Sequence, residues 1–279
     1  MIRLALRVRR EDAEIALAEL LELAPAGVEE VDVSADLVEY AVYGAPGELP
    51  ALPALQAAVG GALVSVSTSE VADDWAERWR EFHQPLRLGG RLEVRPPWRA
   101  AADTEINLVI DPGQAFGTGA HATTALCLAM LLELELPGGA DRTVVDLGCG
   151  SGVLAILAAR LGWGPVTALD YDPLAVEATQ ANAAVNGVAL EAIERFDLRE
   201  SDVPPARLVL ANLLAPLLLL WGQRLAAAPT HRPETIIASG LLISECDRIR
   251  VSFATLGYKE IRHETRQEWA ALLLSRRVG

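Results

Sequence analysis

Short segments in which hydrophobic and polar residues alternate dominate the first 70 residues of the chain. Residues 2–8 (IRLALRV) are typical of a half-buried strand. Residues 11–24 place leucine and isoleucine mostly at helical spacing, and Pro25 and Gly27 follow that helix. Further strands are predicted at 28–33, 37–43 and 62–71, with a turn and a short helix at 44–61. The order βαββαβ predicts a small ferredoxin-like α+β domain over residues 1–70.

Residues 71–100 combine aromatic side chains with residues that interrupt secondary structure. Trp75, Trp79 and Phe82 fall at positions i, i+4 and i+7, on one face of a short helix. The residues that then break the chain are Pro85, Gly89, Gly90, Pro96 and Pro97. We interpret 71–100 as a linker helix and loop, whose aromatic face either docks on a neighbouring domain or packs into a core.

Residues 101–279 alternate predicted strands with predicted helices, which indicates an α/β domain with a mostly parallel sheet. Strands are predicted at 143–147, 164–170, 207–212 and 234–242. Two final strands, 258–266 and 268–277, are expected to form an antiparallel hairpin that closes one edge of the sheet.

Composition and charge narrow the classes of function. The chain has 279 residues, 51% of them hydrophobic, which provides enough apolar surface for a large core. Its formal net charge is −14, and residues 1–74 alone carry 14 acidic and 4 basic side chains. Because negative charge repels nucleic-acid phosphates, we expect a basic protein partner and no DNA. The alternative is that the acidic surface serves only solubility.

The cysteines and the apolar pattern indicate where the protein works. The three cysteines show no CxxC spacing, so we expect neither a disulfide framework nor a metal site. The longest apolar stretch, 208–221, contains Asn212 and Pro216 and is too short to cross a bilayer. Arg3 and Arg7 interrupt the first apolar run, so we expect no signal peptide. The expectation is a soluble, monomeric protein of the reducing cytoplasm, without a membrane partner.

The strongest local signal is a strand, a glycine-rich turn and a helix over residues 143–162. The string DLGCGSG begins at Asp146 and has glycine at 148, 150 and 152. Glycine lets the backbone approach a ligand closely, and nucleotides bind at such strand-to-helix turns. The DxGxGxG spacing differs from the GxGxxG that places a pyrophosphate on a helix N-terminus. An acidic side chain beside the turn suits a ligand with a cationic end better than it suits a pyrophosphate.

Two further polar residues end predicted strands. Asp170 lies 22 residues after the first glycine of the turn, near the spacing at which a carboxylate binds ribose hydroxyls. Its neighbour Asp172 fits a helix cap instead. Asn212 ends the strand 207–212, at the edge of a parallel sheet where ligands bind. The alternative role for Asn212 is to cap the helix that follows.

The most specific string is DPGQAFGTGAHATT, at residues 111–124. Its glycines indicate a flexible loop, and Thr123 and Thr124 are expected to cap the next helix. Together with the motifs above, this string resembles the ribosomal protein L11 methyltransferase family, whose pattern is close to DPGxAFGTGxHPTT. The chain departs from that pattern at Ala122, where proline is usual. The resemblance extends to the linker ending in PPW, to LDYDP, to ANLLA and to the late EW pair, whereas the small domain matches by pattern only.

The resemblance implies a class I (Rossmann-like) methyltransferase domain over residues 101–279 that uses S-adenosylmethionine. The residues it leads us to expect at the cofactor are Thr124, Gly148, Gly150, Asp170, Asn212 and the loop residues Phe116, Gly117, Thr118 and Gly119. The implied substrate is ribosomal protein L11, modified at its N-terminal α-amine and at lysine side chains. Asn212 is the expected catalytic residue, because its carbonyl oxygen can accept the hydrogens of the amine. We interpret His121 as a structural hydrogen-bonding residue rather than a general base.

Four alternatives stay open at this level. Enzymes of the same fold that methylate glutamine amides or adenine usually carry (D/N)PP(Y/F) at the strand end, where this chain has NLLA. A methyltransferase acting on ribosomal RNA is expected to carry a basic face. The DxGxGxG spacing disfavours a nicotinamide-dependent oxidoreductase. A protein that binds the cofactor without catalysis would share the same residue types.

Overall fold

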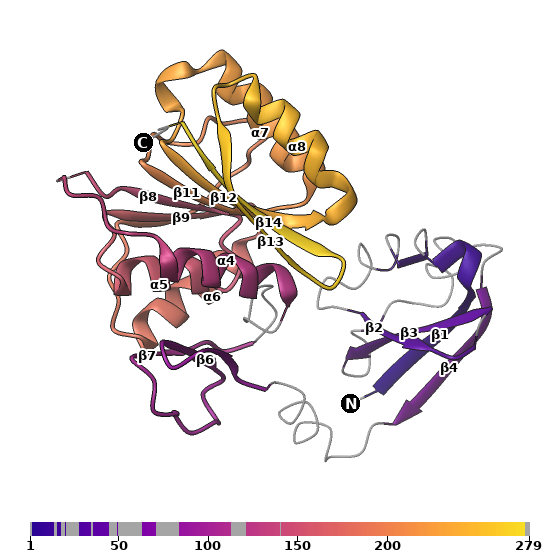
Figure 1. Cartoon of the computed structure of the whole chain (residues 1–279). Helices are drawn as coiled ribbons and strands as arrows, with labels where there is room; N and C mark the ends of the chain where they lie inside the picture. The colour runs from indigo at the N-terminus through magenta and orange to yellow at the C-terminus, as the bar shows by residue number, and fades with distance from the viewer. Residues whose placement is uncertain are drawn as a thin grey trace. The chain divides into compact units, whose positions relative to one another are not determined.

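The computed structural model describes residues 2–13, 16–17, 20, 28–34, 36–44, 49, 63–70, 84–112, 121–139 and 141–276 (Figure 1). The chain divides into two compact units, Met1–Phe82 and His83–Gly279. The first unit holds a four-stranded sheet, and the second holds a seven-stranded and a three-stranded sheet. Within the described part of the chain, no helix is long and apolar enough to cross a membrane.

The N-terminal unit is built on an antiparallel sheet with the order β2-β3-β1-β4. Its strands are β1 (Ile2–Arg9), β2 (Glu29–Asp32), β3 (Leu37–Gly44) and β4 (Leu63–Glu70). Leu6 of β1 and Leu20 are buried in one cluster with Tyr40 of β3, whose hydroxyl donates to the carbonyl of Ala13 at 3.1 Å. Most of the second predicted helix lies outside the described residues, so the ferredoxin-like assignment stays a prediction.

Five parallel strands and an antiparallel hairpin form the central sheet of the C-terminal unit. The strands are β8 (Val144–Leu147), β9 (Val166–Asp170), β10 (Ala192–Arg195), β11 (Leu208–Asn212), β12 (Thr235–Leu242), β13 (Lys259–Arg266) and β14 (Trp269–Ser275). Their order is β10-β9-β8-β11-β12-β14-β13, and β14 is antiparallel to both of its neighbours. This confirms the mostly parallel α/β sheet and the closing hairpin. The order reverses between β8 and β11, and ligands bind at the carboxyl ends of strands at such a point.

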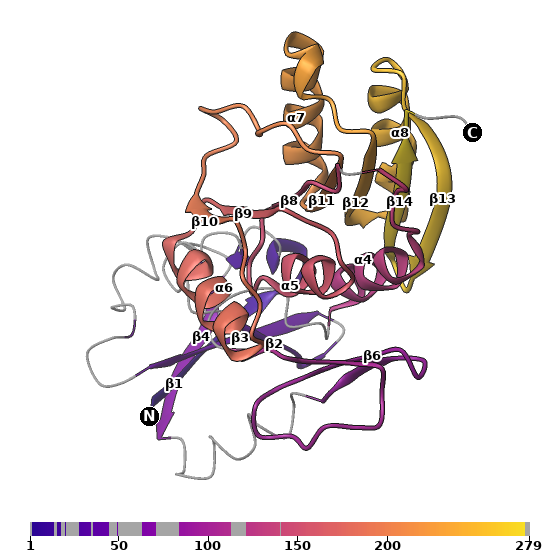
Figure 2. The ribbon, with the colours of Figure 1, turned by 90° about the vertical axis from the view of Figure 1, so that its left-hand side faces the viewer.

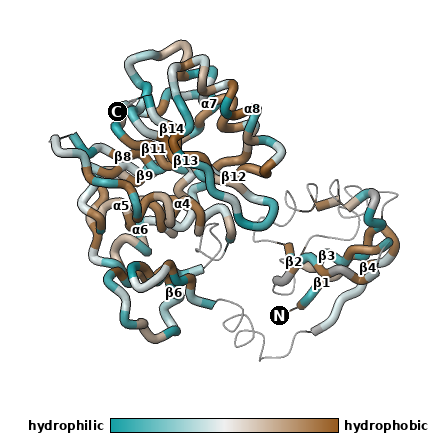
Figure 3. The backbone as a smooth tube through the Cα atoms, in the orientation of Figure 1, coloured by the Kyte–Doolittle hydropathy of each residue, from teal (hydrophilic) through white to brown (hydrophobic). Residues whose placement is uncertain are grey.

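Helices cover both faces of this sheet (Figure 2). On one face lie α4 (Ala122–Glu133), α5 (Val153–Arg160) and α6 (Pro173–Val185), and on the other lie α7 (Ala215–Ala227) and α8 (Cys246–Ala254). The rings of Trp221 in α7, Phe253 in α8 and Tyr258 pack in a row, with centroids 5.8 Å apart in both pairs. The central strands β8, β11 and β12 are strongly hydrophobic (Figure 3), because helices bury them from both sides.

A small sheet packs on the same unit, next to α5. It consists of β5 (Leu86–Leu88), β6 (Leu92–Arg95) and β7 (Ile106–Val109). Leu92 and Val94 are buried in the same core as α4 and α5, so part of the stretch predicted as a linker belongs to the C-terminal unit. The helix predicted around Trp75 and Trp79 lies outside the described residues. The division into residues 1–70, 71–100 and 101–279 therefore stays a prediction.

Glu93, in the middle of β6, is a carboxylate without solvent exposure. Its oxygens accept hydrogen bonds from Arg87 Nε at 2.9 Å and from the N–H of Ala102 at 2.6 Å. Burial alone would raise the pKa of the Glu93 carboxyl, but these two donors lower it below its ordinary value. A lowered pKa contributes stability above the pKa of the unfolded chain, and this contribution is lost as the pH falls through the folded value.

We expect Glu93→Gln to lower the free energy of unfolding at about pH 7 by about 1–3 kcal/mol, because one of the two donors that face this buried carboxylate loses its charged acceptor. The difference from the wild type should shrink in acid, where the wild-type carboxyl is itself protonated. Urea unfolding over a pH series measures both effects. Glu105→Gln is the control, since its exposed carboxylate lies 3.8 Å from Arg91 and should change stability by less than about 0.5 kcal/mol. A loss that does not vary with pH would contradict this account.

Candidate functional site

The glycine-rich turn joins β8 to α5 and is tied to the end of β9. The N–H groups of Gly148 and Cys149 both donate to the carbonyl of Leu169, at 2.8 and 3.0 Å. The three glycines of the turn have φ values of +77°, +53° and +79°, which other residues rarely adopt. At Gly148 a Cβ would also lie 2.5 Å from Leu213 Cδ2. The backbone conformation therefore favours glycine there, and any larger residue would also displace the end of the Leu213 side chain.

Asp170 stands at the carboxyl end of β9, where the glycine turn reaches it. One of its oxygens accepts from the N–H of Gly150 at 2.8 Å, and the other accepts from the N–H of Asp172 at 3.0 Å. A carboxylate has about four lone-pair positions, so both oxygens can still accept from a ligand. Asp172 caps α6 by accepting from the N–H of Leu174 at 2.9 Å, which confirms the cap predicted from the sequence.

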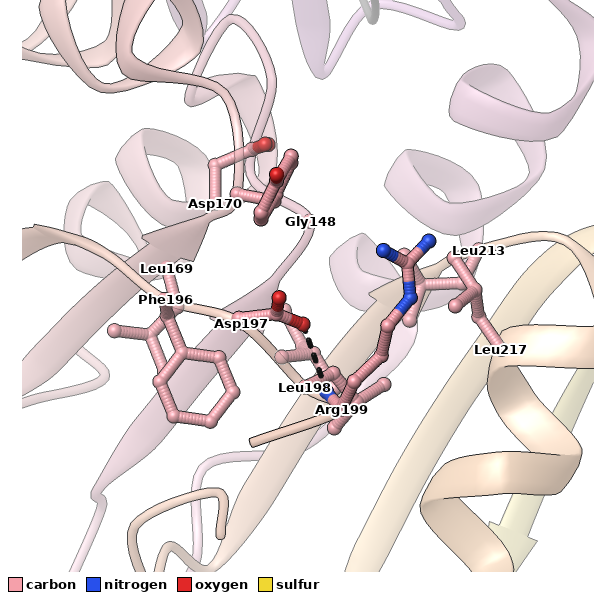
Figure 4. Close-up of a pocket in the computed structure, with 11 residues that line it drawn as sticks. Gly148, Leu169, Asp170, Phe196, Asp197, Leu198, Arg199, Leu213 and Leu217 are labelled. Atoms are coloured by element: carbon pink, nitrogen blue, oxygen red, sulfur yellow. Dashed lines mark hydrogen bonds between the residues drawn. The ribbon is translucent and has the colours of Figure 1, made fainter. Parts of the chain in front are cut away.

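A pocket of about 190 Å³ opens beside Gly148 and Asp170 (Figure 4). Its lining residues come from the ends of β8, β9, β10 and β11 and from the start of α7: Leu147, Gly148, Leu169, Asp170, Tyr171, Phe196, Asp197, Leu198, Arg199, Leu213 and Leu217. Most of these side chains are apolar, and in this view Asp197 lies between Asp170 and Arg199. Such a pocket, apolar with a few polar groups, suits a flat ligand that carries hydroxyl or amino groups.

The part of this pocket that follows β10 is not predicted by the sequence motifs. Phe196 and Asp197 lie directly after that strand, and Asp197 also accepts from the N–H of Arg199 at 2.8 Å. Tyr171 lies under two guanidinium groups, with Arg195 at 5.2 Å and Arg199 at 5.9 Å from its ring. The signal that could have found Asp197 is the one that found Asp170, a carboxylate at the carboxyl end of a strand.

Asn212 and Thr124 meet at the carboxyl end of β11. Asn212 Nδ2 donates to the Thr124 hydroxyl at 3.3 Å, and the Thr124 side chain is buried in α4. The Oδ1 atom of Asn212 is also buried, and it has no hydrogen-bond partner among the described residues. The alternative role of Asn212 as a helix cap is wrong, because α7 begins after Leu214. A buried acceptor without a partner is costly, and a bound ligand that donates a hydrogen bond would satisfy it.

The helix that carries Thr124 is capped by His121 and not by the two threonines. The ring of His121 accepts from the N–H of Thr123 and also contacts the Thr123 hydroxyl at 2.8 Å. Its other side meets Trp269 edge to face, with centroids 5.0 Å apart. Burial lowers the pKa of His121 below its ordinary value, although the charge of Glu268 opposes this. His121 thus has the structural role that the sequence analysis favours.

Asp146 stabilises the start of α5. It is fully buried, and its Oδ2 accepts from the N–H of Ala155 at 3.0 Å. Burial raises the pKa of the Asp146 carboxyl to about 7, and the negative charge of Asp170 acts in the same direction. The acid beside the turn therefore supports the helix rather than lining the pocket.

Asn182 of α6 connects the glycine turn to the segment before residue 113. Its Nδ2 donates to the carbonyl of Ser151 at 2.9 Å, and its Oδ1 accepts from the N–H of Asp111 at 3.0 Å. One turn later, Asn186 pairs with both backbone groups of Val109. The predicted loop residues Phe116, Gly117, Thr118 and Gly119 follow this segment and lie outside the described residues. Nothing in the sequence pattern distinguished these two asparagines from surface residues.

Gly240 supports the segment after Asn212 from the neighbouring strand. Its φ is +82°, and a Cβ would lie 2.5 Å from the carbonyl oxygen of Leu213 and 2.7 Å from its carbonyl carbon. These are backbone atoms, so they cannot move aside by a change of rotamer. The N–H of Leu213 also donates to the carbonyl of Ser239 at 3.0 Å.

The chain is similar over most of its length to one family of known proteins. A family model described as ribosomal protein L11 methyltransferase matches residues 18–277. The ribosomal protein L11 methyltransferase of Pelotomaculum thermopropionicum is 40% identical over 216 residues, which cover 76% of this chain and 69% of that protein. That of Alkaliphilus oremlandii is 33% identical over 244 residues, covering 86% of this chain and 76% of that protein. The crystal structure of a ribosomal protein L11 methylase from Lactobacillus delbrueckii subsp. bulgaricus is similar with a TM-score of 0.62 and 28% identity, and covers 70% of this chain and all of that one.

We expect Gly240→Ala to lower the free energy of unfolding by about 2–5 kcal/mol, because backbone strain and a clash with Leu213 add together. Gly257→Ala is the matched control: its φ is +90°, but a Cβ there meets nothing within 4 Å. In the control only backbone strain should lower the free energy of unfolding, by about 1–3 kcal/mol. Urea unfolding of the three proteins measures the difference, and equal losses would show that the approach of Leu213 to Gly240 costs nothing.

Proposed function

The chain belongs to the ribosomal protein L11 methyltransferase family, and we propose that it methylates amine nitrogens of ribosomal protein L11, at the N-terminal α-amine and at lysine ε-amines. The observation that carries this proposal is the Asn212–Thr124 pair at the sheet edge, next to a pocket lined by Asp170, with a buried Asn212 Oδ1 that has no hydrogen-bond partner in the part of the chain that the structure describes. A methyl-accepting amine has hydrogens to donate to such an oxygen.

S-adenosylmethionine is the methyl donor, and the residues present fit it. When bound, it supplies a methyl group that its sulfonium centre already activates. Asp170 has acceptor positions for two ribose hydroxyls, and Asp197 has one for an exocyclic amino group. Leu147, Leu169 and Phe196 offer apolar surface to a flat base. Gly148 and Gly150 let the backbone approach the ligand, and we assign Thr124, Asn212 and the loop Phe116–Gly119 to the remaining part of the cofactor.

The protein has to present a neutral amine, because an ammonium group has no free lone pair. At about pH 7.5 an α-amine with a pKa of about 7.8 is roughly one-third neutral, whereas lysine with a pKa of about 10.4 is about 0.1% neutral. Presenting neutral lysine thus costs about 4 kcal/mol, and burial reduces this cost by disfavouring the charged form. Asn212 Oδ1 would accept a hydrogen bond from the amine and orient its lone pair toward the methyl group. No dedicated base is required if the proton of the amine leaves to water.

The charge of the N-terminal unit suits a basic substrate. Residues 1–74 carry 14 acidic and 4 basic side chains, and such a field attracts a cationic protein and raises its rate of association. We assign substrate recognition to the small domain, residues 1–70, and methyl transfer to residues 101–279. The same charge argues against DNA as a partner. A monomer working in the cytoplasm, without a membrane partner, completes the proposal.

We expect Asp170→Asn to raise the dissociation constant of S-adenosylmethionine about tenfold to a hundredfold, the loss expected for a hydrogen bond to a charged group. Asp172→Asn is the matched control, because asparagine caps a helix as well as aspartate does and Asp172 does not line the pocket. Calorimetric titration of each variant measures the affinity. Unchanged affinity of Asp170→Asn would remove Asp170 from the cofactor site.

We expect wild-type protein to add methyl groups to ribosomal protein L11 in steps of one methylene mass, and Asn212→Ala to lower kcat about a hundredfold through loss of amine orientation. Intact-mass spectrometry of ribosomal protein L11, followed by peptide mapping, measures the rate and locates the amines. Gln223→Ala, which removes an exposed amide of α7, should keep the wild-type rate. Absence of methylation by a wild type that binds the cofactor would overturn the substrate, and a wild-type rate for Asn212→Ala would overturn the role of Asn212.

A further inference from the structure

Three large aliphatic side chains are exposed where β11 and β12 end. Leu214 is 61% exposed, Leu242 is 38% exposed and Ile243 is 46% exposed. Leu214 lies two residues beyond Asn212, and Ile243 begins the short 3-10 helix that follows β12, Ile243–Glu245. We call Leu214, Leu242 and Ile243 the aliphatic rim. Single exposed aliphatic residues are common on protein surfaces, so exposure alone does not indicate a binding role. The evidence for such a role is the position of the rim next to Asn212.

The pocket extends from β11 toward β8, β9 and β10, and Leu213 and Leu217 line its β11 side. Leu242 and Ile243 lie at the end of β12, on the opposite side of β11, and Leu214 follows β11 itself. Asn212 pairs in register with Ser239 of β12. Gly240 then approaches the backbone of Leu213, so the two chain segments leave the sheet side by side. A substrate that reaches Asn212 from the side away from the pocket therefore passes the rim.

A carboxylate stands at the same edge. Glu268 is exposed and precedes β14 in the turn of the β13–β14 hairpin. Its carbonyl accepts from the N–H of Ile243 at 2.9 Å, and the next residue, Trp269, pairs in register with Leu242. Trp269 also contacts His121, which caps the helix that carries Thr124. Glu268 is thus placed between the rim and the start of α4.

We propose that the aliphatic rim and Glu268 form the surface along which a substrate lysine side chain reaches Asn212. This inference rests on the proposed function, and it names the recognition element for one class of amine. Lysine is the side chain that matches both features, because it carries a positive charge at the end of a four-carbon apolar stem. The carboxylate attracts the charged end, and the rim buries the stem and strips water from the amine as it approaches Asn212. Removal of that water favours the neutral form that the reaction needs.

The rim should discriminate between the two classes of amine. At neutral pH a lysine ε-amine is almost entirely in the charged form, whereas a large fraction of an α-amine is already neutral. Methylation of lysine therefore depends more on desolvation, which favours the neutral form. An α-amine also has no four-carbon stem to lay on the rim. A polar substitution in the rim is therefore expected to slow lysine methylation selectively.

The test compares Ile243→Ser with Ile261→Ser. Ile261 of β13 is 56% exposed, a similar aliphatic surface near the opposite end of the hairpin from Glu268. We expect Ile243→Ser to lower kcat/KM for the lysine ε-amines of ribosomal protein L11 about fivefold or more, and that for the α-amine less than about twofold. Ile261→Ser should change neither. Peptide mapping by mass spectrometry gives both rates from one reaction mixture.

Glu268→Gln provides a second variant, with Glu177→Gln on the exposed side of α6 as its control. We expect Glu268→Gln to raise KM for lysine methylation more at low salt than at high salt, because ions screen an exposed charge. Equal effects of Ile243→Ser on both classes of amine, or no effect of either variant, would overturn the inference while the proposed function stands. A wild type that binds S-adenosylmethionine, as calorimetry measures, and methylates no amine of ribosomal protein L11 would overturn both.

Discussion

Close packing of Leu213 between two glycines sets the positions of the parts of the site. The Leu213 backbone lies so close to Gly240 of β12 that no Cβ fits there, and the end of its side chain lies where a Cβ on Gly148 of the glycine turn would stand. These contacts connect β8, β11 and β12 at the point where the strand order reverses. Asn212 directly precedes Leu213, so this packing also fixes the position of the Asn212 backbone at the end of β11. A side chain that is already in position can orient a reactant without a free-energy cost for its own reorganisation.

The acidic groups around the pocket differ in how their charge is used. Asp170 accepts hydrogen bonds from two backbone N–H groups and remains able to accept from a ligand. Asp146 is fully buried, and its raised pKa leaves it only partly charged near neutral pH. Glu268 is exposed and acts through its field at the surface. Negative charge is thus kept on Glu268 at the surface and on Asp170 in the pocket. It is reduced on Asp146 inside the fold, where desolvation of a charge is most costly.

Four parallel strands and the closing hairpin of the C-terminal unit could be predicted, because the parallel ones are apolar runs that end near polar residues. The strand β10, whose last two residues are exposed and charged, was missed, as were the short strands β5, β6 and β7. The cap of α6 was also local, since Asp172 before a proline is sufficient to specify it. The start of α4 was not predicted correctly: the threonines that could cap it lie inside the helix, and His121 caps it through a ring that packs on Trp269. That choice depends on a residue almost 150 positions away in the chain, which no local rule contains.

The sequence by itself determined the α/β class, the glycine turn and the polar residues at the ends of β9 and β11, because backbone conformation and strand polarity are local properties. Only the tertiary structure decided which of these groups meet. Thr124 contacts Asn212 across 88 residues, Asn182 connects Ser151 to Asp111, and Asp197 joins Asp170 in one pocket. Such contacts arise from the strand order and from helix packing on the sheet, and a side chain's neighbours there are fixed by three-dimensional distance rather than by spacing along the chain.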